Sequence, residues 1–95
     1  MSKRTRNRDW LLYIKMQPCL ICNQDGPSEA HHLREHVGMG RKASDHATIP
    51  LCQPCHRDYH AGTRAFRRQH GSDLELLERT LDRVLPGLVS PKGDF

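Results

Sequence analysis

The sequence has no long apolar run and few aromatic side chains. Of its 95 residues, 5% are aromatic and 36% are hydrophobic, and the mean hydropathy is −0.75. No stretch approaches the ~20 apolar residues of a membrane-spanning helix, and the basic start MSKRTRNRDW lacks the apolar segment of a signal peptide. We therefore expect a cytoplasmic protein without membrane contact, whose thin core needs a disulfide or a metal for stability.

The sequence has fewer acidic than basic residues. It contains 11 Asp and Glu and 15 Lys and Arg, which gives a net charge of +4. This excess fits a polyanionic partner such as nucleic acid, although a solvated surface accounts for it equally well. We expect residues 1–8 to form a flexible basic arm, residues 9–87 a single domain and residues 88–95 a loose tail. The arm is either a disordered terminus or a contact to phosphates.

Apolar spacing and capping signals predict an α+β fold. Helices are expected over residues 9–17, 54–61, 63–69 and 72–85, and strands over 29–37 and 47–51. Ser72 and Glu75 form a capping box, and Pro86 with Gly87 should end the last helix. Its apolar face is expected to consist of Leu74, Leu77, Leu81, Val84 and Leu85.

Four cysteines occur as two C-x-x-C pairs. They are Cys19, Cys22, Cys52 and Cys55, with 29 residues between the pairs. Two disulfides or one zinc site are both compatible with this pattern, but closely spaced pairs that bind one ion together favour zinc. A folded segment must occupy the long central gap. We expect a structural Zn²⁺ whose removal unfolds the domain.

Four histidines accompany the cysteines and are not needed for a Cys₄ site. His31 and His32 are adjacent, and His56 and His60 are four residues apart on a predicted helix. Positions i and i+4 share a helix face, so both imidazoles can point at one ion. Adjacent strand residues point to opposite sides, so one of His31 and His32 can bind metal while the other meets a substrate. The alternative is that these histidines are part of an ordinary polar surface and bind no metal.

These residues lie in motifs that resemble the HNH (ββα-metal) nuclease superfamily. The motifs are P-C-x-x-C, A-H-H-L, G-x-G-R-K and I-P-L-C-x-x-C-H-x-x-x-H, within residues 18–62. Within that superfamily the chain most resembles small phage and prophage recombination-enhancement proteins, which act with the RecA filament of a bacterial host. The resemblance implies a small ββα-metal core cross-linked by zinc, with flanking N- and C-terminal helices.

The resemblance also assigns roles in DNA phosphodiester hydrolysis. His31, His56 and His60 would hold the catalytic metal, and His32 would be the general base. The expected products carry 5′-phosphate and 3′-hydroxyl ends, and cutting would be weakly sequence-specific. Three imidazoles suit Zn²⁺, Mn²⁺, Co²⁺ or Ni²⁺ better than Mg²⁺, which prefers oxygen ligands. The implied partners are DNA and a RecA-type filament.

One departure from the family pattern concerns the asparagine that holds the loop behind the general base. The only asparagines are Asn7 and Asn23, and neither lies between His32 and Cys52. We predict that Asp45, or else the neighbouring His46, takes this place, because a carboxylate can orient an imidazole through its N–H. The alternative is that Asp45 only caps the loop.

Basic residues around the motifs are candidates for contacts to DNA phosphates. They are Arg34, Arg41, Lys42, Arg57, Arg64, Arg67 and Arg68. A non-catalytic zinc module that binds nucleic acid or a protein is the competing hypothesis, and a nuclease active only with a RecA-type partner is a third. A binding module has no need of His32 beside a three-histidine metal site.

Overall fold

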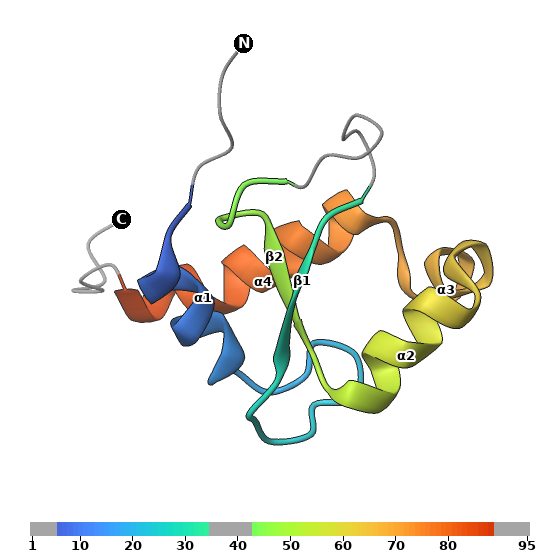
Figure 1. The fold of residues 1–95 in the computed structure, drawn as a ribbon, viewed down its shortest axis with the longest axis horizontal. Coiled ribbons are helices and arrows are strands. Elements are labelled where there is room, and N and C mark those ends of the chain that lie inside the picture. The colour runs from blue at the N-terminus through green and yellow to red at the C-terminus, as the bar shows by residue number, and fades with distance from the viewer. Residues whose placement is uncertain (1–5, 35–42, 89–95) are drawn as a thin grey trace, which may run out of the picture.

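Two short strands lie at the centre of the fold, with helices on either side (Figure 1). The computed structural model describes residues 6–34 and 43–88. In chain order the elements are α1 (Arg8–Lys15), β1 (Glu29–His32), β2 (Thr48–Leu51), α2 (Gln53–Ala61), α3 (Thr63–His70) and α4 (Asp73–Leu88). The predicted α+β class is confirmed, with a helix flanking the sheet at each end of the described chain.

The two strands pair antiparallel and fix which side chains face which helices. Ala30 lies opposite Pro50, and His31 lies opposite Ile49. In Figure 1, α1 lies on one side of this hairpin, α2 and α3 lie on the other, and α4 passes behind it. Because side chains two apart on a strand share a side, β1 presents alternate residues to α2.

The hydrophobic core is small and includes the cysteines. Among the described residues, the buried apolar side chains include Ile14, Cys19, Leu20, Ile49, Leu51, Cys52, Tyr59, Phe66, Leu76 and Val84. They come from α1, the loop after it, β2 and the three later helices. Such a core agrees with the expectation that a small domain with few apolar residues needs additional cross-linking.

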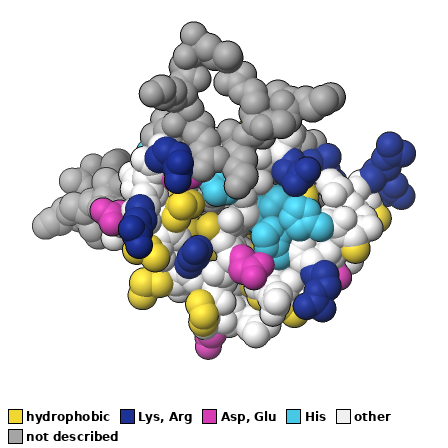
Figure 2. All heavy atoms as spheres, viewed as in Figure 1, with side chains coloured by type: hydrophobic (Ala, Val, Ile, Leu, Met, Phe, Trp, Pro, Cys, Tyr) yellow, Lys and Arg dark blue, Asp and Glu magenta, His cyan; other side chains and the backbone are white. Residues whose placement is uncertain are grey.

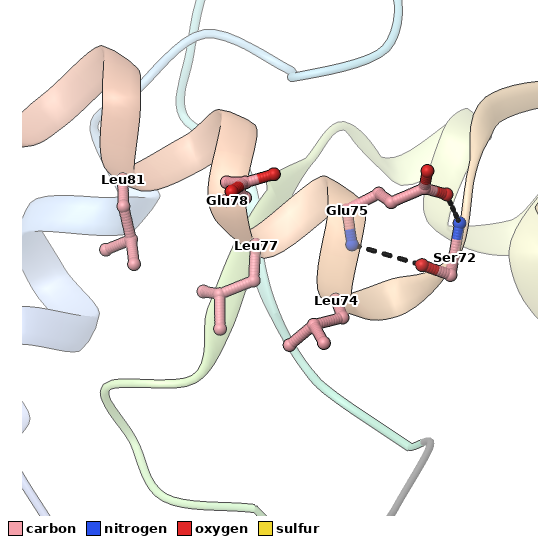
Figure 3. Close-up of a pocket in the computed structure, with 6 residues that line it drawn as sticks. All are labelled: Ser72, Leu74, Glu75, Leu77, Glu78 and Leu81. Atoms are coloured by element: carbon pink, nitrogen blue, oxygen red, sulfur yellow. Dashed lines mark hydrogen bonds between the residues drawn. The ribbon is translucent and has the colours of Figure 1, made fainter.

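Helix α4 begins with the predicted capping box, but of the five apolar residues expected in the core only Val84 is buried. Ser72 and Glu75 exchange two hydrogen bonds, from Ser72 N–H to Glu75 Oε1 at 2.8 Å and from Glu75 N–H to Ser72 Oγ at 3.1 Å (Figure 3). The core contacts come from Leu76, Thr80 and Val84. Leu74 was expected in the core but is 57% exposed. Leu74, Leu77 and Leu81 instead line a groove (Figure 3).

Several predicted element ends are shifted. Helix α1 ends at Lys15, before the predicted end at residue 17, and β1 ends at His32, well before residue 37. Helix α4 continues through Pro86 to Leu88, because a proline this close to the helix end removes little of the hydrogen-bond ladder. The predicted arm, residues 1–8, and the predicted tail, residues 88–95, lie mostly outside the described residues, as do Arg41 and Lys42 in segment 35–42. Within the described residues, Asn7 and Arg8 form the start of α1 and Leu88 ends α4.

Candidate functional site

The four cysteines converge into one cluster. Their Sγ atoms all lie within 4.8 Å of one another, and Cys22 Sγ is 3.6 Å from Cys52 Sγ. Sulfurs bound tetrahedrally to Zn²⁺ at ~2.3 Å are about 3.8 Å apart, so the spacing fits one ion. The cluster joins the loop after α1 to the start of α2, where Cys52 is the N-cap residue. It is therefore compatible with a structural metal site.

The thiols of this cluster have unequal tendencies to ionise. Burial opposes ionisation of Cys19, but hydrogen bonds from the backbone of Cys22, Cys52 and Ile21 outweigh it and lower the pKa of Cys19 to about 6. Burial raises the pKa of Cys52 and of Cys55, where the neighbouring thiols add to the effect. Four such sulfurs can all be thiolates only with a cation among them.

Three histidines form a second cluster, built by β1 and α2. His31 Nδ1 and His60 Nε2 each lie 3.2 Å from His56 Nε2. Nitrogens bound tetrahedrally to an ion at ~2.0–2.1 Å are about 3.3 Å apart, so these three atoms fit one divalent metal. His56 and His60 lie one turn apart on α2, and His31 lies across from them on β1. The predicted grouping of His31, His56 and His60 is thus present in the structure.

The surroundings keep two of these imidazoles neutral, which is the form that binds metal. His31 is 3% exposed, and its ring centroid lies 4.2 Å from that of Tyr59. Burial, followed by the neighbouring His56, lowers the pKa of His31 to about 4. Burial and His56 also lower the pKa of His60, and Arg34 contributes in the same direction.

His32 contacts a different partner from that of its neighbour. Its Nε2 lies 2.9 Å from Asp45 Oδ1. An ionised carboxylate only accepts hydrogen bonds, so the proton sits on Nε2 and the lone pair on Nδ1. Asp45 is 1% exposed, and its own backbone carbonyl accepts from Thr48 Oγ1 at 3.0 Å. The structure therefore places Asp45 where the sequence predicted an orienting carboxylate.

Asn7 supports the same loop from the N-terminal side. Its backbone N–H donates to Asp45 Oδ2 at 2.8 Å, and its Nδ2 donates to His46 Nε2 at 3.1 Å. Its Oδ1 accepts from Trp10 N–H and so caps the N-terminus of α1. Its position in the sequence had excluded Asn7 from the loop behind His32, yet the fold brings it there across 38 residues.

Glu29 was missed by reasoning from the sequence. Its Oε1 accepts a 2.7 Å hydrogen bond from His56 Nδ1. The available signal was its position two residues before His31 on a predicted strand, which puts both side chains on the side of β1 that faces α2. Figure 2 shows one large surface patch of histidine side chains, with an Asp or Glu side chain beside it and Lys and Arg side chains around it.

A buried polar network lies behind His31. Tyr59 Oη donates to Asp73 Oδ1 at 2.9 Å, and Arg34 N–H donates to Asp73 Oδ2 at 2.7 Å. Arg67 Nη2 donates to Tyr59 Oη at 2.8 Å. Burial, together with the Asp73 carboxylate, raises the pKa of Tyr59 to about 12, so the phenol stays protonated.

The predicted phosphate-contacting residues divide into two groups. Arg67 was expected at the nucleic-acid surface, but its guanidinium is turned inward to Tyr59 and Asp73. The remaining members within the described residues are exposed: Arg34, Arg57, Arg64 and Arg68. Arg41 and Lys42 lie outside the described residues.

Comparison with known proteins places the chain in a family. The DUF968 family, described as a protein of unknown function, matches residues 1–86, and the chain belongs to it. The uncharacterized protein YdfU of Escherichia coli (strain K12) is 39% identical over 90 residues, covering 87% of this chain and 26% of the relative. The chain therefore spans about a quarter of the length of this curated relative. No solved structure matches it.

Within residues 6–34 and 43–88, none of the helices combines the length and the apolar character that crossing a bilayer requires.

Proposed function

We propose that this chain is a metal-dependent DNA endonuclease or nickase of the HNH (ββα-metal) type. The proposal rests mainly on one observation: the two adjacent histidines of β1 contact different groups. His31 joins two further histidines in a cluster that fits one ion, while His32 is held by a buried carboxylate. A three-histidine metal site next to an oriented neutral base is an arrangement suited to metal-assisted hydrolysis.

His32 acts as the general base. Its Nε2–H is fixed on Asp45, so Nδ1 is the atom that accepts a proton from the attacking water. Asp45 holds the ring in this tautomer and stabilises the imidazolium that forms. Asn7 and Thr48 hold Asp45 in turn, through hydrogen bonds to its carboxylate and to its backbone carbonyl.

His31, His56 and His60 would hold the catalytic ion, with Zn²⁺, Mn²⁺, Co²⁺, Ni²⁺ and Mg²⁺ as candidates. When bound, a divalent ion there supplies charge stabilisation to the scissile phosphate and its leaving oxygen. The Cys₄ cluster would carry a separate structural Zn²⁺.

DNA is the proposed substrate because exposed basic side chains flank the histidine patch. Arg34 lies two residues after the end of β1, and Arg57 lies on α2. Both side chains are exposed. Contacts of this kind go to phosphates and carry no base information, so cutting is expected to be weakly sequence-specific. A role in phage or prophage recombination, with a RecA-type filament as partner, belongs to the same proposal.

The proposal is tested with supercoiled plasmid in Mg²⁺ and in Mn²⁺, for wild type and His32→Ala. Wild type should nick the plasmid, and His32→Ala should fold, retain metal and lose about 10²–10⁴-fold in rate. His70→Gln is the matched control, because His70 packs on Phe66 and lies outside both metal clusters. It should cut like wild type.

A second arm adds RecA, ATP and a single-stranded guide to each reaction. Cleavage by wild type only in this arm would identify a partner-dependent nuclease. Equal cleavage by wild type and His32→Ala would remove His32 as the base. Absence of cleavage in every arm would reject the nuclease and favour a zinc-binding module without catalysis.

A further inference from the structure

We propose that Glu29 is a positioning residue that fixes the tautomer of His56 and tightens metal binding at the histidine cluster. This inference rests on the proposed function, because it concerns the same cluster. It starts from the 2.7 Å hydrogen bond between His56 Nδ1 and Glu29 Oε1. Glu29 is the first residue of β1, and its carboxylate remains half exposed, at 50% of the side-chain surface.

The contact with Glu29 assigns one tautomer to His56. Because Glu29 accepts from Nδ1, the proton of the neutral ring sits on Nδ1 and the lone pair on Nε2. His56 Nε2 is also the atom that lies 3.2 Å from His31 Nδ1 and 3.2 Å from His60 Nε2. The carboxylate thus holds the ring with its metal-binding nitrogen facing the other two ligands.

The charge of Glu29 adds to this orientation. Three neutral imidazoles leave a divalent ion with its full +2 charge, and a carboxylate hydrogen-bonded to one ligand makes that ligand more basic. Carboxylate partners of metal-binding histidines typically contribute 10–100-fold in metal affinity. Since Glu29 and His31 are two apart on β1, one strand supplies both a ligand and the group that orients a second ligand on α2.

The test is a Co²⁺ titration of protein that already carries zinc in its cysteine cluster, followed by the visible absorption of the bound ion. Glu29→Ala should weaken Co²⁺ binding by about 10–100-fold. Glu29→Gln keeps an acceptor oxygen but no charge, and should weaken binding by about 10-fold. Asp58→Asn is the matched control, because it removes one exposed carboxylate from α2, the helix that carries His56 and His60. Its affinity should stay within about two-fold of wild type.

A second readout needs no metal at the histidines. Long-range ¹⁵N–¹H spectra of the imidazoles should show His56 as the Nδ1–H tautomer in wild type. In Glu29→Ala, His56 should revert to the Nε2–H form that free histidine favours. A loss of stability alone would not change the tautomer of His56, so this readout separates a positioning role from a structural role.

The outcomes distinguish this inference from the proposed function. Wild-type affinity and tautomer in both Glu29 variants, with Co²⁺ bound, would overturn only the role of Glu29. An equal loss in Asp58→Asn would overturn it as well, by showing a general charge effect. A wild-type protein that binds no Co²⁺ at the histidines would overturn both proposals. If Glu29→Ala does not fold, the Co²⁺ affinities of Glu29→Gln and Asp58→Asn are compared instead. Equal affinities of these two variants would overturn the role of Glu29.

Discussion

The Asp45 carboxylate is almost completely removed from solvent and has a different partner on each oxygen. Oδ1 accepts from His32, and Oδ2 accepts from the backbone N–H of Asn7. An asparagine in its place cannot satisfy both donors, because its Nδ2 must face one of them. With Nδ2 toward His32, the ring is driven to the tautomer that carries its proton on Nδ1, the atom proposed to act as base.

Asp45→Asn should therefore lower kcat by about 10–100-fold and leave KM nearly unchanged, since oriented general bases contribute about 10²–10⁴-fold in all. Both constants are measured by plasmid nicking, under the metal and partner conditions in which wild type is found to cleave. In a His32→Ala background the same substitution should have no further effect on rate. A folded Asp45→Asn protein with wild-type kcat would leave Asp45 with the role of a loop cap alone.

His31 links protonation to the stability of the fold. Its folded pKa of about 4 lies below the ordinary value of 6.5, because the ring is buried and faces His56. Below pH 6.5 the unfolded chain takes up a proton that the folded chain does not, so stability falls as pH drops from 6.5 toward 4. By pH 5 the loss should be about 2 kcal/mol in protein without metal at the histidines.

Urea unfolding at several pH values from 7 to 5 measures this loss, with wild type compared with His31→Gln. The variant should lack this part of the pH dependence, whereas His70→Gln should retain it. Parallel curves for wild type and His31→Gln would show that burial of His31 does not control the acid sensitivity of the fold.

Among the elements, α4 shows how leucine spacing can indicate the wrong face. Leu76 is 0% exposed and Leu74 is 57% exposed, although both lie in the same leucine-rich turn. Leu76→Ala should cost about 2–5 kcal/mol in unfolding free energy, and Leu74→Ala should stay within about 0.5 kcal/mol. Chemical denaturation measures both. Equal costs for the two substitutions would contradict this packing of α4.

Most elements were predictable because their signals are local. Ser72 with Glu75 marks the start of α4, Gly62 and Gly71 separate the helices, and Pro54 lies in the first turn of α2. The face of α4 was not predictable, since leucines occupy both its buried and its exposed positions. Arg67 was misplaced for a related reason: helical position alone did not reveal that α3 turns it toward the buried Asp73.

For the molecule as a whole, the cysteine cluster connects segments that the thin core alone holds weakly. Removal of the proposed zinc with a chelator under reducing conditions, or the substitution Cys52→Ser, should abolish the cooperative melting transition. Circular dichroism during thermal unfolding measures it, with re-addition of Zn²⁺ as the control for the chelated protein. A normal melting curve in Cys52→Ser would contradict a stabilising metal in this cluster.

The candidate site was predictable where residue type and spacing define it, and not where it depends on the tertiary fold. The grouping of the cysteines and histidines follows from two close pairs, a strand doublet and an i, i+4 helix pair. Glu29 lies 27 residues from His56, and Asn7 lies 38 residues from Asp45. No local pattern connects either pair, because the strand register and the packing of α1 bring them together.

Cys55 and His56 are consecutive residues of α2, so the two proposed metal sites share one piece of backbone. An ion bound by the thiolates would order the first turn of the helix that carries His56 and His60, and would thereby lower the entropy cost of binding the second ion. By thermodynamic reciprocity, the second ion also strengthens retention of the first. If the proposed nuclease activity is present, a thiol oxidant should therefore abolish it without reacting with any of the histidines.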